Sequence, residues 1–595
     1  MVKLSGAFAA ILLGVALFVS CQTPERDRPS PAAGAGAGPA SPTSAAGPFD
    51  LIITGGYVVD GTGAPWVLAD VGITDDRITA IRAPGGAGGI GALGDAHAKQ
   101  RIDATGLVVA PGFIDMLGQS EFNVLVDPRA ASKIMQGVTT EITGEGSSIA
   151  PLNDRLFAGA KEQFDRYGLT LDFRTLDGYF HRLETTSKPA INVGTFVGAG
   201  GLRSYVIGDS QREATLAELE QMKQLVAEAM EQGALGLGTS LQYVPDRFAS
   251  TDELVELASV AAKYGGIYIS HQRSESGQIL SSLDEVFTIA EKAKIPAEVW
   301  HLKTAYKANW GRMPEVLRRF DEARARGLDV TYNMYPYDRA SNGLHSCLPL
   351  WVRDGGVDPM IAKLKDPSLR DRIKREMGDP NVKDWENQWY GSGGGAGVPL
   401  STVVEPELRK YEGMTLEEIG RARGVDPRDA LMDIVIADKG RSDVIISIMD
   451  ERDVRAALAS PMMAIGTDSG ARAEDGPLSL SKSHPRGWGS YPRILARYVR
   501  DEKLLTLEDA VRRFTSRAAW RVGISDRGIL RPGMKADITI FDAATVRDLS
   551  TYADPSHYST GIRHVIVNGQ AVVSDGKMTD ARPGQVIRGR GYRHK

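Results

Sequence analysis

Hydrophobic positions near the two ends of the chain come in short runs that alternate with turn residues. Between residues 51 and 103, apolar runs such as residues 51–53 are separated by turns rich in glycine or aspartate, and the same texture returns over residues 536–569. Short apolar runs bounded by such turns are typical of antiparallel strands. We therefore predict one small β-sandwich domain that is assembled from both ends of the chain, residues 49–110 and 527–595.

The middle of the chain instead alternates helical and strand-like periods. Thr215 and Glu218 form a capping-box pattern at the start of an apolar helical stripe that ends at Gly233, and a strand of small residues follows. This rhythm repeats about every 30 residues, which is typical of parallel strands joined by crossover helices. Because it extends over about 400 residues, a closed ring is favoured over an open sheet. Residues 111–526 are therefore predicted to form a (β/α)₈ barrel of the TIM type, in the α/β class.

Side chains that can bind a metal follow several of the predicted strands. His271 and His301 each come directly after an apolar strand, and Glu145 and Asp468 end two further apolar runs. The carboxyl ends of barrel strands meet at one rim, where such enzymes place their catalytic groups. Neutral imidazole and carboxylate bind zinc, and a carboxylate beside a zinc-activated water can act as general base. The competing interpretations are histidines that only hydrogen-bond within the core and an aspartate, Asp468, that only forms a turn.

Composition narrows the class of protein without indicating a substrate. The 595 residues suffice for a barrel of about 250 residues together with a further domain. The net charge of -5 argues against a protein that binds nucleic acid in bulk, because such proteins carry a basic surplus. With two cysteines, Cys21 and Cys347, the chain has neither a disulfide framework nor a zinc site of the multi-cysteine kind.

The first residues have the pattern of an export signal followed by a tether. The apolar run over residues 7–19 is short for a membrane span and suits a signal peptide, and Ser20-Cys21 resembles the end of a bacterial lipobox. Residues 1–21 are therefore predicted to be a lipoprotein signal peptide with lipidation at Cys21, and residues 22–48 a disordered linker. We therefore expect the protein to be anchored on the periplasmic side of a bacterial membrane, with the outer membrane favoured. Ordinary secretion with an incidental cysteine is the alternative.

Taken together, the motifs identify a family. From about residue 50 to residue 589 the sequence resembles the N-acyl-D-amino-acid deacylase (D-aminoacylase) branch of the amidohydrolase superfamily. The resemblance is carried, in chain order, by residues 51–56 (LIITGG), 110–115 (APGFID), 137–140 (GVTT), 270–273 (SHQR), 301–303 (HLK), 335–337 (YPY), 465–468 (IGTD), 484–486 (HPR) and 531–537 (RPGMKAD).

The resemblance implies a zinc enzyme in which His271 and His301 are metal ligands and Asp468 is the acid and base. It also implies that substrate is held by Lys303, Tyr335, Ser341 and Arg486. The planar fork of Arg486 suits a substrate carboxylate, although a structural ion pair is the competing role. Tyr243 follows a predicted strand and can reach the same pocket, with ordinary loop packing as the alternative.

The chain departs from the family pattern at several positions. The family carries His-x-His after the first strand, whereas Leu117 and Gln119 stand here, so a second metal is not expected at that site. Gly146 stands where the family has a ligand cysteine, and the neighbouring Glu145 is the candidate replacement, which gives a site of two histidines and one glutamate. A charged rim residue or a substrate contact is the alternative role for Glu145. Ala199 replaces a further family histidine.

We therefore expect hydrolysis of an amide bond by one zinc ion per chain, with an N-acyl-D-amino acid as the small-molecule substrate. Two alternatives stay open: the same chemistry on another amide, a cyclic imide, a dipeptide or a lactone, and a catalytically silent binding protein at the cell surface. His345, in the loop after Ser341, either lines the pocket or faces solvent. The sequence carries no signal for an oligomeric state.

Overall fold

The computed structural model describes residues 48–83, 92–382, 385–479 and 482–593. The predicted signal peptide, Cys21 and the predicted linker up to residue 47 lie outside the described residues. No described helix is both long and apolar enough to cross a membrane.

A ring of parallel strands confirms the predicted barrel. Within the described residues, the strands are β6 (Phe113–Asp115), β7 (Val138–Thr143), β8 (Asn192–Thr195), β9 (Val197–Gly198), β10 (Gly236–Ser240), β11 (Ile267–His271), β12 (Ala297–Val299), β13 (Val330–Met334) and β17 (Met463–Ile465). They pair in two runs, β6-β7-β8 and β9-β10-β11-β12-β13-β17.

Backbone hydrogen bonds between the two runs close the ring. The amide of Phe196, between β8 and β9, donates to the Thr143 carbonyl of β7 at 2.9 Å. At the other junction, the amide of Met116 donates to the Ile465 carbonyl of β17 at 2.9 Å. Since β8 and β9 are successive segments of one strand, the ring has the eight positions that the sequence predicted.

Helices cover the outside of the ring and alternate with its strands. The longest, α6 (Leu216–Gln232), begins with the capping box of Thr215 and Glu218 and ends at Gly233, whose φ of 112° is left-handed, both as expected from the pattern. The other helices up to β13 are α1 (Asn123–Val126), α2 (Ala131–Ile134), α3 (Asp154–Arg166), α4 (Leu176–Arg182), α5 (Ala199–Val206), α7 (Thr251–Lys263), α8 (Ile279–Ala293) and α9 (Met313–Ala325).

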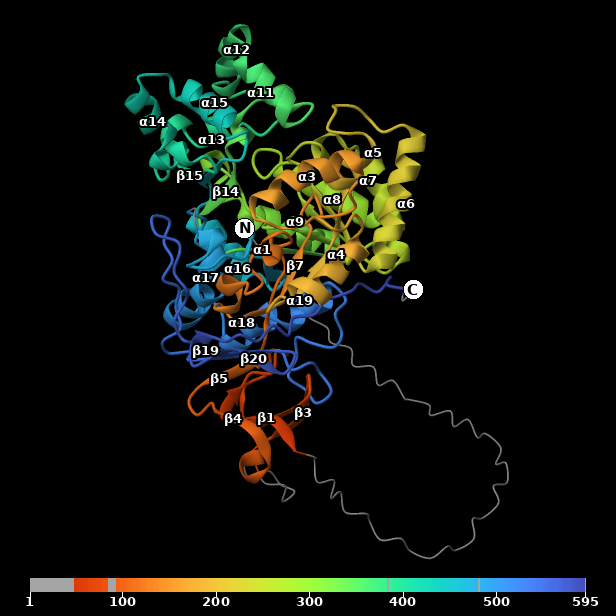
Figure 1. The fold of residues 1–595 in the computed structure, drawn as a ribbon, viewed down its shortest axis with the longest axis vertical. Helices are drawn as coiled ribbons and strands as arrows, with labels where there is room; N and C mark the ends of the chain where they lie inside the picture. The colour runs from red at the N-terminus through yellow and green to blue at the C-terminus, as the bar shows by residue number, and fades with distance from the viewer. Residues whose placement is uncertain (1–47, 84–91, 383–384, 480–481, 594–595) are drawn as a thin grey trace, which may run out of the picture. The chain divides into compact units, whose positions relative to one another are not determined.

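Between β13 and β17 the chain leaves the barrel and builds a further group of elements, here called the cap segment. Three strands, β14 (Arg339–Gly343), β15 (Leu400–Thr402) and β16 (Asp443–Ser447), form a small antiparallel sheet. The helices of the cap segment are α10 (Leu350–Arg353), α11 (Val357–Lys365), α12 (Pro367–Met377), α13 (Gln388–Gly391), α14 (Leu416–Arg423) and α15 (Pro427–Ala437). Of these, α11 to α15 are labelled in Figure 1 and lie together there. The barrel resumes with α16 (Glu451–Ala459), and α17 (Arg486–Arg493), α18 (Leu507–Phe514) and α19 (Ser516–Arg521) follow β17.

A nine-stranded sheet draws its strands from both ends of the described chain. The N-terminal strands are β1 (Phe49–Val58), β2 (Val67–Thr74), β3 (Arg77–Arg82), β4 (Ala98–Asp103) and β5 (Val108–Pro111), and the C-terminal strands are β18 (Ile538–Phe541), β19 (Ile562–Val567), β20 (Gln570–Ser574) and β21 (Lys577–Met578). Strand β5 joins the two sets, since it pairs with both β1 and β18. Side chains from both sets, such as Val71 and Ile538, share one buried cluster.

The pairing within this sheet differs from the expectation of purely antiparallel strands. Strand β1 pairs with β4 and with β5 in parallel, so the sheet is mixed. Parallel pairing requires a crossover, and the chain makes one between β3 and β4. The alternation of apolar runs indicates strands but does not indicate which strands become neighbours.

Candidate active site

Three predicted ligands meet at the carboxyl ends of the barrel strands. Glu145 follows β7, His271 ends β11 and His301 follows β12. Glu145 Oε1 lies 3.1 Å from His271 Nδ1 and 3.0 Å from His301 Nε2. One ligand atom from each residue lies within 4.8 Å of the others, close enough for all three to hold one metal ion. Hydrogen bonds from the two imidazoles outweigh the effect of burial and hold the pKa of Glu145 well below its ordinary value.

Two of the site residues adopt a backbone conformation that non-glycine residues seldom use. The φ angles are 36° at His301 and 52° at Asp468, both in the left-handed region. Each such residue costs about 1–3 kcal/mol and persists where the surrounding structure fixes it, often at functional sites. His301 lies two residues after the end of β12 and Asp468 three residues after the end of β17, so both lie where the chain leaves the barrel strand.

A buried ion pair lies behind the two histidines. Lys303 Nζ lies 2.6 Å from Glu275 Oε1 and 2.7 Å from His301 Nδ1. Glu275 Oε1 is also 3.0 Å from His301 Nδ1, and its Oε2 is 3.9 Å from His271 Nε2. Burial opposes ionisation of Glu275, but Lys303 and the two histidines outweigh it and lower the pKa of this carboxyl. Lys303 was predicted to hold substrate, and the structure gives its ammonium a partner within the protein.

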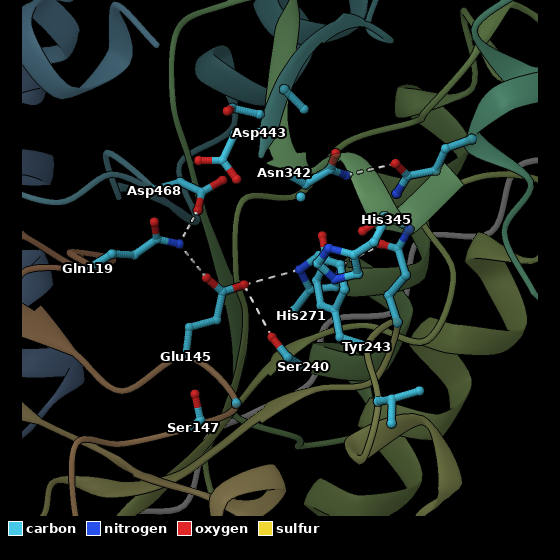
Figure 2. A pocket seen from close by; sticks show the side chains of 18 of the residues that line it. Gln119, Glu145, Ser147, Ser240, Tyr243, His271, Asn342, His345, Asp443 and Asp468 are labelled. Atoms are coloured by element: carbon cyan, nitrogen blue, oxygen red, sulfur yellow. Dashed lines mark hydrogen bonds and ion pairs between the residues drawn. The ribbon is translucent and has the colours of Figure 1, made fainter. Parts of the chain in front are cut away.

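Asp468 faces the three ligands across the amide of Gln119. Gln119 Nε2 donates to Glu145 Oε2 and to Asp468 Oδ1, each at 2.9 Å (Figure 2). Asp468 Oδ2 forms an ion pair with Arg486 Nη1 at 2.6 Å. Burial raises the pKa of Asp468 despite the opposing charges of Arg486 and His301. A raised pKa makes this carboxyl a stronger proton acceptor than an ordinary aspartate, which suits a group that must take up a proton and return it.

The site opens into a cavity of about 690 Å³, a size suited to a small molecule. Among the predicted substrate-binding residues, the cavity wall includes Lys303, Ser341, Arg486 and Tyr243. The ring of Tyr243 packs edge-on against His271, with centroids 5.0 Å apart. Tyr335 is not part of the described cavity wall; its ring lies 4.6 Å from the Arg486 guanidinium carbon, so it supports Arg486 rather than facing the cavity. Arg486 Nη2 also donates to the Ser341 carbonyl at 3.3 Å.

Some residues of the site did not emerge from the sequence. Glu275 lies four positions after His271, just beyond the recognised SHQR motif, and nothing in its surroundings distinguishes it from a surface acid. Gln242 Oε1 lies 2.7 Å from His271 Nε2 and fixes that ring from the side away from Glu145. Gln119 was noted only as the replacement of a histidine, whereas its amide joins the two carboxylates.

Comparison with known proteins places this geometry among amidohydrolases. A family model described as "Amidohydrolase family" matches residues 415–573. A D-aminoacylase from Alcaligenes xylosoxydans xylosoxydans is 34% identical over 549 residues, which cover 91% of this chain and 98% of the relative. The chain is also similar to the structure of an N-acyl-D-glutamate deacylase from Bordetella bronchiseptica, which was solved in complex with zinc and a phosphonate mimic of the tetrahedral intermediate. The TM-score is 0.72 and the sequence identity is 32%, and the match covers 91% of this chain and all of that one. A further similar structure is that of a D-aminoacylase with a binuclear metal centre, for which activation by one metal and attenuation by the second are described. Its TM-score is 0.73 and its sequence identity 33%, and the match again covers 91% of this chain and all of that one.

Proposed function

This chain belongs to the D-aminoacylase family of the amidohydrolases, and from that premise we propose that it hydrolyses the amide bond of N-acyl-D-amino acids with one bound zinc ion. One observation carries the proposal. Glu145, His271 and His301 converge on a single point at the barrel rim, and Asp468 lies across Gln119 from them. Two imidazoles and one carboxylate are a known donor set of catalytic zinc sites, so the residues present fit the metal.

The metal ligands, Asp468 and Arg486 have different roles in the proposed reaction. A zinc ion held by the three ligands would polarise the scissile carbonyl and lower the pKa of a water molecule. Asp468 accepts the proton of the attacking water and returns it to the leaving nitrogen. Arg486, which lies beside Asp468 on the cavity wall, binds the α-carboxylate of the substrate and so places the amide between Asp468 and the ligands.

Gln119 and Leu117 support the proposed metal count of one. The amide of Gln119 fills the gap between Glu145 and Asp468 and donates to both carboxylates. Leu117, with no exposed surface, belongs to the apolar cluster beneath the site and offers no ligand atom. We therefore propose a mononuclear site, in contrast to the relative that is described with a binuclear centre.

The test is an assay of purified protein on paired N-acetyl-D- and N-acetyl-L-amino acids, with zinc measured on the same sample. We expect hydrolysis of the D series and close to one equivalent of zinc. His271→Ala should lose both the metal and turnover, whereas His181→Ala, which removes an exposed histidine of α4, should retain both. Metal-independent turnover, or full turnover by His271→Ala, would contradict the proposal.

We also propose that the enzyme is anchored by lipid at Cys21 on the periplasmic side of a bacterial membrane. The support is the sequence pattern of residues 1–21, with the tether-like composition that follows. Fatty-acid labelling of the full-length protein in a bacterial host tests this. Label should enter the wild type and be absent from Cys21→Ser, and equal labelling of both would reject the anchor.

A further inference from the structure

The cavity continues past the catalytic groups to the part of the cap segment that follows β14. Ser346 and Arg353 from this stretch lie on the cavity wall. Both are buried: the exposed fraction is 1% for Ser346 and 7% for Arg353. Ser346 Oγ and Arg353 Nε have no hydrogen-bond partner among the described residues. Two buried polar side chains with unused hydrogen-bonding capacity therefore face one end of the cavity.

The charge of Arg353 has no carboxylate to balance it within the described chain. The groups that act on it electrostatically are Tyr243, Arg247, Cys347 and His345, none of which is a carboxylate. Burial lowers the pKa of Arg353 to about 10, which still leaves the guanidinium charged at neutral pH. Buried charged groups are normally paired, because burial removes their hydration and an unpaired ion has no attraction to compensate for that free-energy cost.

Two other cationic side chains on the cavity wall, unlike Arg353, form ion pairs with carboxylates of the protein. Lys303 contacts Glu275 at 2.6 Å, and Arg486 contacts Asp468 at 2.6 Å. These two cations are balanced before any substrate enters. Arg353 differs from them, so a ligand anion at this end of the cavity would gain a buried charge-assisted interaction without displacing a protein carboxylate.

Tyr243 connects this end of the cavity with the catalytic end. Its ring packs against His271, and its hydroxyl acts electrostatically on Arg353, so one side chain forms the wall that both ends share. A substrate whose amide lies at His271 can therefore extend an arm along Tyr243 to Arg353.

We propose that Arg353, assisted by the hydroxyl of Ser346, binds a second carboxylate of the substrate, remote from the scissile amide. Given the proposed deacylase function, on which this inference rests, the substrates are N-acyl amino acids with an additional carboxylate. That carboxylate is either the acidic side chain of the amino acid or the far end of a dicarboxylic acyl group. The fork of an arginine grips either one in the same bidentate manner.

Two matched substrate pairs test the inference and separate the two sources. N-acetyl-D-glutamate is compared with N-acetyl-D-glutamine, and N-succinyl-D-leucine with N-butyryl-D-leucine. We expect kcat/KM to be at least about tenfold higher for the acid than for its neutral partner in one of the pairs. A hydrogen bond to a charged group strengthens binding by about this factor. The pair that shows the preference identifies the arm. Equal rates within both pairs would overturn the inference.

Variants then assign the preference to Arg353. Arg353→Met should reduce kcat/KM for the acid of the preferred pair at least about tenfold more than for its neutral partner, and Arg353→Lys should keep part of the preference. Arg372→Met is the matched control, because it removes an arginine from α12 of the same cap segment that pairs with Glu376 and lies outside the described cavity wall. Equal losses on both substrates in Arg353→Met would contradict the proposed contact.

A binding measurement that needs no turnover keeps this inference separate from the proposed function. Glutarate should raise the Tm of the zinc-loaded wild type and of Arg372→Met, and should have no such effect on Arg353→Met. Because that variant loses an unpaired buried charge, it should fold with a Tm no lower than that of the wild type. Arg353-dependent stabilisation without hydrolysis of any N-acyl substrate would support the carboxylate site and reject the deacylase. Hydrolysis of N-acyl substrates with no preference for the acid, together with no stabilisation by glutarate, would support the deacylase and reject the carboxylate site.

Discussion

At the scale of single residues, Gln119 is the side chain that we expect to limit the site to one metal ion. Its amide spans two carboxylates, Glu145 and Asp468, at 2.9 Å each, in a position where the related family pattern has a histidine. We expect the wild type to bind one equivalent of zinc and to show no inhibition by excess zinc. The double variant Leu117→His with Gln119→His should bind a second equivalent, because two imidazoles replace an alkyl group and an amide.

Metal content by elemental analysis, with zinc titration of activity, checks this expectation. Gln119→Ala is the control, since it removes the bridging amide without adding a ligand, and it should remain at one equivalent. Two equivalents in the wild type would refute the mononuclear site.

Glu275 acts on the metal site from behind the ligands. It lies against His301 Nδ1 and pairs with Lys303, so it orients the imidazole and balances a buried cation. Glu275→Gln should weaken zinc binding about 10–100-fold, as other losses of outer-shell partners do. It should also destabilise the protein by about 3 kcal/mol, because Lys303 is left buried and unpaired.

Adding Lys303→Met to Glu275→Gln separates these two effects. The double variant should recover stability in chemical denaturation but not zinc affinity in competition with a chelator. Recovery of both would mean that Glu275 serves only to neutralise Lys303.

The sequence indicated the backbone positions of the site better than the contacts of its side chains. Glu145, His271 and His301 follow barrel strands, and strand ends can be located from apolar runs, so their meeting at one rim was predictable. Tyr335 also follows a barrel strand, yet it lies behind Arg486 and off the cavity wall. Whether a side chain faces the cavity depends on χ angles and on neighbours far away in sequence, and no local pattern records these.

At the scale of elements, the turn after β7 determines where Glu145 lies. Gly146 has a φ of 68°, and a Cβ on it would lie 2.3 Å from Ser240 Cβ on β10. Gly146→Ala should therefore displace Glu145, weaken zinc binding and destabilise the fold by more than backbone strain alone. Gly168→Ala is the matched control, since φ is 66° there and nothing lies within 4 Å of the added carbon.

The control should cost about 1–2 kcal/mol of stability, the strain of a left-handed non-glycine residue, and leave zinc binding intact. Measuring the zinc affinity and the denaturant midpoint of unfolding for both variants tests this prediction. Equal behaviour of both would show that the contact with Ser240 does not hold the turn.

Elements with a strong local signal were predictable, and those defined by distant partners were not. The capping box of Thr215 and Glu218 and the left-handed Gly233 mark both ends of α6 within the sequence itself. The cap segment has short helices and three-residue strands such as β15, too short to show a period. The parallel pairing of β1 with β4 depends on how the chain crosses over after β3, which alternation does not encode.

At the scale of the whole molecule, the two ends of the described chain belong to one sheet. The similar apolar texture near both ends predicted a shared β-domain, and strands β5 and β18 pair directly across it. The sequence could indicate this joining because short apolar runs separated by turn residues occur at both ends of the chain and not in the long middle. It could not indicate that β5 would be the strand at the junction.

Buried carboxyl groups give the whole molecule a predictable pH dependence. Burial raises the pKa of Asp246 to about 7, and that of Glu121 and of Glu386 to about 7 as well. A carboxyl whose pKa is higher in the folded than in the unfolded state binds its proton more tightly when folded. The contribution of these three carboxyls to the free energy of unfolding therefore falls as pH rises from about 4 to about 7.

Asp246 provides the sharpest test, since it is only 2% exposed and its Oδ1 has no hydrogen-bond partner among the described residues. Asp246→Asn removes the titration and keeps an oxygen that can accept from the Ser240 amide, as Asp246 Oδ2 does at 2.5 Å. The variant should be about 2–4 kcal/mol more stable than the wild type at pH 8, with the difference shrinking toward zero near pH 4. Denaturant unfolding of both proteins across this range measures the difference. A constant difference at all pH values would mean that the amide changes packing and that Asp246 does not titrate with folding.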